Sequence, residues 1–223
     1  FLKKQIRRKH IKYILLALLV LPIAVQAAGS VAIQSNFLVR GHSQTNTEPA
    51  VQGSLSKTFQ NGLYVGTWGS NIAFDGGLEL DVFTGVKHQH GNFTLDVGVL
   101  HHNYPNQPFH DGGLTSNFTE YYGKVSWNKG LGVGYYHSPD YFSIGGREAG
   151  QNDYYYIDTN LIKSDEHSLD FHYGMTQSSV FDYDDWSVTY TKNFRTVDFF
   201  IEHHDTSGML SEETTMFGVR KVF

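Results

Sequence analysis

The chain has 223 residues and no cysteine, which excludes a disulfide scaffold, a cysteine-ligated metal site and a thiol nucleophile. Its formal net charge is -5, but residues 1–27 hold six Lys and Arg and no Asp or Glu, so the acidic remainder argues against nucleic acid as a partner. With 23 Gly, 14 Tyr, 16 Phe and only 17 % charged residues, the composition favours strands and tight turns over helical bundles.

Residues 1–27 have the layout of a secretory signal peptide. A basic segment from Lys3 to Lys12 precedes an apolar run from Tyr13 to Ile23, and small residues around Ala27 offer a cleavage site. The apolar run is short for a transmembrane helix, so a retained N-terminal anchor is the less favoured alternative. We therefore expect export of a mature domain that comprises residues 28–223.

After Ala28 the dominant hydrophobic period is two, as in the segment from Leu78 to Val86, where apolar residues alternate with polar or small ones. Tight connections such as Asn61-Gly62 alternate along the chain with longer ones such as Asp140–Asn152. This pattern predicts about 12 strands, near residues 31–40, 50–59, 63–72, 78–90, 93–104, 116–128, 131–139, 153–164, 167–178, 183–194, 197–205 and 212–223.

The alternation of short and long connections is typical of an outer-membrane β-barrel. Such barrels have an even number of antiparallel strands, short periplasmic turns and longer extracellular loops. Aromatic residues gather near the strand ends, and the last strand closes on Phe223. We therefore predict an all-β, antiparallel transmembrane barrel in the cell outer membrane, and a soluble sandwich or lipocalin-like barrel is the alternative.

This fold predicts a set of partners. The outer face of the barrel would contact outer-membrane lipid and lipopolysaccharide, and the C-terminal strand that ends at Phe223 would be recognised by the barrel-assembly machinery. Small solutes would be the other partners. We expect no cofactor.

The mature chain resembles the TorF porin family, a proteobacterial family of outer-membrane barrels without an established function. The resemblance is carried by Arg40-Gly41-x-Ser43-Gln44, by Pro49–Gly53 and by Gly66-Thr67-Trp68-x-Ser70-Asn71, with further matches at Leu78–Asp81 and near Trp186. It implies an outer-membrane barrel that forms a pore, and it implies neither a substrate nor a catalytic residue.

The polar face of the predicted strands supplies the candidate pore-lining residues. These are the acids Glu79, Asp81, Asp96, Glu120, Asp158, Asp170, Asp185, Asp198 and Glu202 and the bases Arg40, Lys87, Lys124 and Arg220. Nine acids against four bases predict a channel that prefers cations, with its densest negative patch at Glu79, Asp81 and Asp96. Alternatively, these groups pair with one another inside a plugged lumen, and the barrel is structural or adhesive.

The 12 histidines do not indicate a metal site. His88-x-His90 offers only two ligands, and the members of the adjacent pairs His101-His102 and His203-His204 point to opposite faces of a strand. A barrel hydrolase is the least favoured alternative, because no catalytic triad can be recognised. We therefore predict a non-enzymatic porin-like channel for the passive diffusion of small polar solutes.

Overall fold

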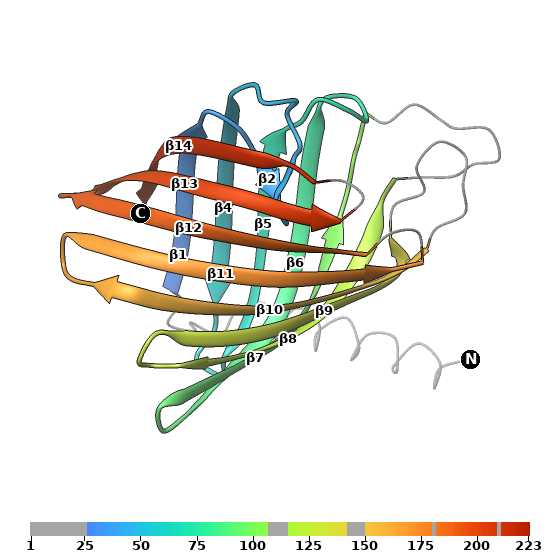
Figure 1. Ribbon diagram of the computed structural model, residues 1–223. Helices are drawn as coiled ribbons and strands as arrows, with labels where there is room; N and C mark the ends of the chain where they lie inside the picture. The colour runs from blue at the N-terminus through green and yellow to red at the C-terminus, as the bar shows by residue number, and fades with distance from the viewer. Residues whose placement is uncertain (1–25, 107–115, 142–149, 180–181, 209–210) are drawn as a thin grey trace, which may run out of the picture.

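The computed structural model describes residues 26–106, 116–141, 150–179, 182–208 and 211–223, and these form an antiparallel barrel of 12 strands (Figure 1). The barrel strands are β1 (Gln26–Gln34), β4 (Ala50–Thr58), β5 (Leu63–Asn71), β6 (Leu78–His90), β7 (Phe93–His102), β8 (Phe118–Trp127), β9 (Leu131–Tyr141), β10 (Gly150–Lys163), β11 (His167–Ser178), β12 (Tyr183–Phe194), β13 (Val197–Gly208) and β14 (Glu213–Val222). The described residues contain no helix long and apolar enough to cross a membrane.

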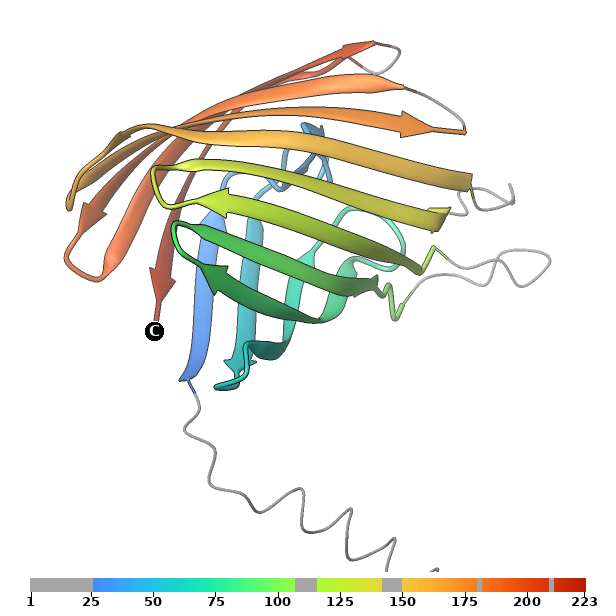
Figure 2. The ribbon, with the colours of Figure 1, turned by 90° about the horizontal axis from the view of Figure 1, so that it is seen from below.

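Each barrel strand pairs with the strands that precede and follow it in the barrel, and the pairing of β1 with β14 closes the ring. This closing seam runs from Ser30 opposite Val222 to Gln34 opposite Gly218. Two backbone hydrogen bonds of 2.8 and 3.0 Å between Gly29 and Phe223 extend it to the end of the chain. The start of β1 and the C-terminus therefore lie side by side (Figure 2).

The two ends of the barrel differ in their connections. Tight turns join β4 to β5, β6 to β7, β8 to β9, β10 to β11 and β12 to β13, and both ends of the barrel chain lie at this tight-turn end. The other connections, which have four to 15 residues against two to four in the tight turns, gather at the opposite, long-loop end. The alternation read from the sequence is therefore present, although residues 142–149 of the loop Asp140–Asn152 lie outside the described residues.

The first strand differs from its predicted span of residues 31–40. Strand β1 begins earlier and ends at Gln34, after which residues 35–49 leave the barrel wall and form a separate hairpin of β2 (Leu38–Val39) and β3 (His42–Ser43). Left-handed backbone angles at Arg40 (φ 49°) and Gly41 (φ 83°) make the turn of this hairpin, so the chain reverses direction where the predicted strand would have ended. The predicted signal peptide falls largely on residues 1–25, which lie outside the described residues.

Large apolar side chains are exposed on the outer face of the barrel, whereas charged side chains are buried on its inner face. Ile33 and Phe217 are 55 % and 66 % exposed, whereas Glu120 and Asp185 are 3 % and 1 % exposed. A soluble barrel or sandwich would bury its apolar faces, whereas a membrane barrel presents them to lipid and keeps a polar interior. The predicted outer-membrane type of barrel is therefore confirmed over the soluble alternative.

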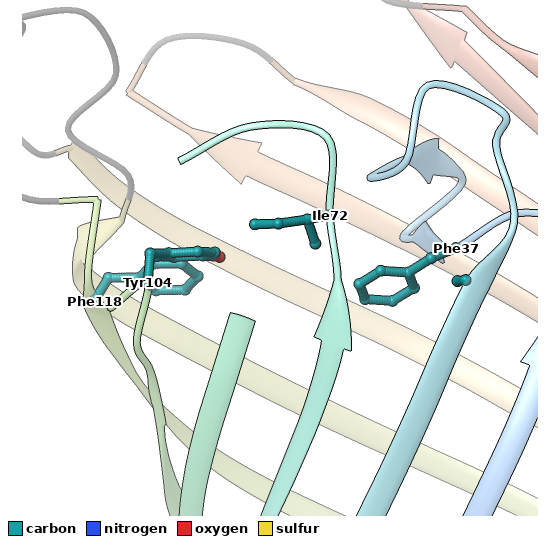
Figure 3. Packing of buried hydrophobic residues seen from close by; sticks show 5 residues of the cluster. Phe37, Ile72, Tyr104 and Phe118 are labelled. Carbon is teal, nitrogen blue, oxygen red and sulfur yellow. The ribbon is translucent and has the colours of Figure 1, made fainter. Parts of the chain in front are cut away.

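A small apolar cluster lies inside the barrel at the long-loop end. Its buried members are Phe37, Ala50, Ile72, Tyr104 and Phe118; Figure 3 shows all five and labels all but Ala50. The rings of Phe37 and Trp68 lie 5.2 Å apart, which packs the start of segment 35–49 against β5. The cluster therefore anchors this segment against the β5–β8 side of the barrel.

Candidate channel constriction

The segment of residues 35–49, here called the inward hairpin, enters the lumen from the long-loop end. Gln44 N donates a hydrogen bond of 2.7 Å to Phe37 O, which brings the two ends of the β2–β3 hairpin together. At the tip, a Cβ on Gly41 would overlap Thr206 of β13 and lie 3.4 Å from Cβ of Asp185 of β12. Only glycine allows the tip to approach this wall so closely.

The Arg40 side chain extends from the tip of the inward hairpin to β8. Its Nη2 atom lies 2.6 Å from Oε1 of Glu120, and the guanidinium lies 4.1 Å from the centroid of the Tyr154 ring. Burial of the guanidinium acts to lower its pKa, but the neighbouring Glu120 carboxylate outweighs this effect, so the pKa of Arg40 is raised. Arg40 therefore stays charged. Its ion pair with Glu120 ties the hairpin tip to β8, and the hairpin that is held there narrows the lumen.

A cluster of acids surrounds His102 next to this ion pair. Nδ1 of His102 lies 3.1 Å from Oε1 of Glu79 and 3.2 Å from Oδ2 of Asp81, both on β6. Nε2 of His102 lies 3.2 Å from Oε2 of Glu120, so the histidine contacts three carboxylates. The Phe118 ring stacks on the imidazole at 4.2 Å between centroids and covers one of its faces.

Below the hairpin, the lumen contains a cavity of about 620 Å³. It extends from Arg40 to Gly130 and Asn160 at the tight-turn end. Besides Arg40 and Tyr154, the charged and titratable residues of its wall are Asp158, Asp170, His172, Asp185, Glu202 and His204. The lumen is therefore wide and polar toward the tight-turn end, whereas the inward hairpin occupies the lumen toward the long-loop end.

Apart from Arg40, the candidate pore-lining residues predicted from the sequence lie on barrel strands, at positions that face the lumen. Three of the four bases contact acids, because Lys87 lies 3.5 Å from Asp96 and Arg220 lies 3.2 Å from Asp198, in addition to the Arg40 pair. The fourth base, Lys124, lies over the rings of Tyr122 and Tyr136, at 4.6 and 5.0 Å from their centroids. Arg40 reaches the lumen from the hairpin tip and not from the barrel wall.

Three histidines join this inner face, and the count of acids and bases from the sequence missed them. Besides His102, His172 lies 2.5 Å from Asp158 and 3.2 Å from Asp185, and His204 contacts Glu202. Each of the three lies an even number of residues from an inward acid on its own strand, so both side chains point to the same face. This spacing is visible in the sequence and could have predicted the inward position of the histidines. The inner charge therefore depends on histidines as well as on Lys and Arg.

The densest negative patch differs from the predicted one. Glu79 and Asp81 gather with Glu120 around His102, whereas Asp96 lies apart and accepts a hydrogen bond of 2.5 Å from the Tyr64 hydroxyl. The pairing of β6 with β7 places Asp96 opposite Lys87, near the tight-turn end, and this separates it from the other two acids.

The barrel wall separates the members of the adjacent pairs His101-His102 and His203-His204, and likewise those of Asp184-Asp185. His101 contacts Thr119 at 3.0 Å and His203 contacts Thr215 at 2.9 Å, both on the outer face. Asp184 accepts a hydrogen bond of 3.0 Å from Tyr173 on the outer face, whereas its neighbour Asp185 points inward. The neighbouring acids of β12 and the neighbouring histidines of β13 are thus divided between the two faces.

Comparison with known proteins gives a family and a fold. The sequence matches the family described as "Bacterial protein of unknown function (Gcw_chp)" over residues 22–219, and no curated protein matches it. The solved KdgM porin is similar in structure, with a TM-score of 0.58 and 13 % identity, over 88 % of this chain and 99 % of that chain.

Two further solved structures are similar. The KdgM porin in complex with disordered oligogalacturonate has a TM-score of 0.55 and 13 % identity, over 88 % of this chain and 98 % of that chain. The NanC porin has a TM-score of 0.50 and 14 % identity, over 88 % of this chain and 99 % of that chain. At these identities the similarity concerns the fold, which is that of outer-membrane porins.

Proposed function

This chain belongs to the Gcw_chp family of bacterial proteins of unknown function, and we propose that it is an outer-membrane channel for the passive diffusion of small polar solutes, with a preference for cations. The observation that carries the proposal is the polar cavity of about 620 Å³ that extends from Arg40 to the tight-turn end of the barrel. The fold shared with porins and the sequence resemblance to the TorF porin family support it further.

The cation preference rests on acids that no Lys or Arg neutralises. Asp158 and Asp170 face the cavity, where Asp158 contacts His172 and Asp170 accepts hydrogen bonds from Asn160 and Ser168. The side chain of Asp158 is 52 % exposed, so passing ions can reach its carboxylate. Carboxylates along a narrow pore attract cations and repel anions. A polyanion such as the oligogalacturonate bound by the KdgM porin would therefore be a poor solute for this lumen.

The proposal includes the location and orientation of the barrel. Export by the N-terminal signal peptide would deliver it to the outer membrane, with assembly through the C-terminal strand and with lipid and lipopolysaccharide around its apolar face. The long-loop end would then face outward and the tight-turn end the periplasm. A solute would meet the inward hairpin first and enter the wider cavity below it.

The reversal potential in planar bilayers under a KCl gradient tests this function. We expect discrete conductance steps and a potential on the cation-selective side for the natural protein. The double variant Asp158→Asn, Asp170→Asn should move the potential toward the non-selective value, because it removes two negative charges from the cavity wall. Asp184→Asn is the control, since it removes one negative charge from the outer face and none from the cavity wall. An anion-selective natural channel would contradict the proposed preference.

A structural or adhesive barrel with a plugged lumen is the second candidate function. The observation that favours it is the inward hairpin itself, which the apolar cluster holds at Phe37 and which Arg40 ties to Glu120. A plugged barrel gives no conductance in the same bilayer experiment, in the natural protein and in the double variant alike. Conductance steps would therefore decide for the channel.

A further inference from the structure

We propose that Glu79, Asp81 and His102 form a binding site for one divalent transition-metal cation of the Zn²⁺ class, within the constriction. The ligand atoms that these three side chains offer lie within 4.8 Å of one another. Two of the residues come from β6 and the third from β7, so only the pairing of these strands assembles the site. Neither the adjacent histidines nor His88-x-His90 indicated it in the sequence.

The distances from the imidazole to the two carboxylates match tetrahedral coordination. Around an ion with ligands at about 2.0–2.1 Å, neighbouring ligand atoms of a tetrahedron are about 3.3 Å apart. Nδ1 of His102 lies 3.1 Å from Oε1 of Glu79 and 3.2 Å from Oδ2 of Asp81. An ion could therefore take its place among these atoms with only small side-chain movements.

An unpartnered buried oxygen also indicates a ligand at this place. Asp81 is only 5 % exposed, and its Oδ1 atom has no hydrogen-bond partner among the described residues. A buried carboxylate oxygen without a partner is costly, because water no longer solvates it. Bidentate or shared coordination of a cation by Asp81 would satisfy this oxygen.

The surroundings of His102 have the arrangement found around metal-bound histidines. Such a histidine usually gives its second ring N–H to a carboxylate, which fixes the orientation of the ring. Here Nε2 of His102 lies 3.2 Å from Glu120, and Arg40 holds Glu120 in turn at 2.6 Å. The Tyr104 hydroxyl donates a hydrogen bond of 3.3 Å to Glu79 and orients that ligand.

The charges of the cluster balance with a divalent cation. Glu79, Asp81 and Glu120 bring three negative charges, and Arg40 compensates one of them. A protonated His102 would leave the cluster with one net negative charge, whereas a divalent cation with a neutral imidazole makes it neutral. Buried clusters are most stable when their charges are compensated, so the site favours an ion of charge two.

The ligand types select among divalent ions. One imidazole and two carboxylates suit Zn²⁺ and similar transition metals, whereas Ca²⁺ takes six to eight oxygen ligands and Mg²⁺ keeps several waters. The bound ion would lie beside the Arg40–Glu120 pair and so obstruct the narrow part of the lumen. This obstruction rests on the proposed channel function, but binding of the ion does not.

The test is calorimetric titration of the folded, detergent-solubilised full chain with ZnCl₂. We expect saturable binding of one Zn²⁺ per chain, which an excess of MgCl₂ leaves in place. His102→Gln and Asp81→Asn should each weaken binding at least tenfold, and the positioning variant Glu120→Gln should weaken it about 10–100-fold. His204→Gln is the matched control, because His204 also contacts an inward acid, and it should leave binding unchanged.

Absence of saturable binding, or binding that His102→Gln and Asp81→Asn leave unchanged, would overturn the metal site. If these variants fail to fold, X-ray absorption of Zn²⁺ on the natural protein provides a second measurement. One imidazole with oxygen ligands supports the site, and a shell of oxygen ligands alone contradicts it. Conductance recorded with and without Zn²⁺ separates the metal-site proposal from the channel proposal. A barrel that binds Zn²⁺ but shows no conductance would overturn the channel and leave the metal site standing.

Discussion

Nη2 of Arg40 lies 2.6 Å from Oε1 of Glu120, although the two residues are 80 positions apart in the sequence. Their side chains are 9 % and 4 % exposed, so the pair is shielded from water. One partner belongs to the inward hairpin and the other to β8, and the pair therefore determines where the hairpin lies in the lumen. A buried pair of this kind is costly to break, because the remaining charge is left without compensation.

Replacement of Arg40 by glutamine should release the hairpin and destabilise the barrel. Loss of one partner of a buried ion pair costs about 3–5 kcal/mol, and a released hairpin leaves a wider path. We expect a lower free energy of unfolding in urea and a larger single-channel conductance. The control is Arg220→Gln, because the Arg220 side chain is 47 % exposed and its pair with Asp198 contributes only about 0–1 kcal/mol. Equal conductance of the Arg40 variant and the natural protein would contradict this role of the hairpin.

Deletion of residues 38–43 tests the constriction more directly. Because Gln44 N donates to Phe37 O at 2.7 Å, a two-glycine link can replace the β2–β3 hairpin without moving its flanks. The deletion removes Arg40 and the tip that approaches Thr206, so we expect the conductance to rise further than in the single variant. The migration of unboiled samples on gels checks that the barrel still folds. A conductance below that of the natural protein would show that the hairpin does not limit the flow.

The sequence predicts the barrel well but not the hairpin. The period of two, from Leu78 to Val86 for example, fixes which side chains face lipid, and the short turns fix the order of the strands. The first strand was misjudged because the polar residues that follow Gln34 continue an alternation that is equally compatible with a strand. Their departure from the wall depends on contacts with distant residues, above all Glu120, which no local pattern reveals.

The site could be predicted only in part, for a similar reason. Alternation places Glu79, Asp81 and Glu120 on the inner face, but it does not say which acids meet. That depends on the register between strands and on the hairpin tip. In the sequence His102 is only one half of an adjacent histidine pair, whereas its contacts with two acids of β6 depend on the strand pairing.

Gly174 should tolerate no side chain. A Cβ there would overlap the Tyr154 hydroxyl and lie 2.6 Å from Oδ2 of the buried Asp185. We expect Gly174→Ala to lower the free energy of unfolding by about 1–3 kcal/mol, the usual cost of overpacking. Gly132→Ala is the matched control on the same inner face, because the nearest atom to its Cβ is 3.8 Å away. Urea unfolding measures both, and equal midpoints would contradict the close packing of Tyr154.

Cysteine labelling on intact cells tests the orientation of the barrel. The chain has no natural cysteine, so a single introduced one is unambiguous. Asn106 lies in a long connection and Asn61 in a tight turn, and both are exposed. We expect a membrane-impermeant maleimide to label Asn106→Cys and to leave Asn61→Cys unlabelled until the cells are lysed. The reverse pattern would mean that the tight turns face outward.

The seam between β1 and β14 has a consequence for how the chain assembles. Ser30 and Val222 are neighbours there, so the ring closes only between residues from opposite ends of the sequence. Every other strand pair of the barrel except β1 with β4 is joined by a single turn or loop, and such local pairs form much sooner than distant ones. An open, curved sheet with two unpaired edges should therefore precede the closed ring. Until the last residues arrive, these edges are the part of the chain most exposed to misassembly.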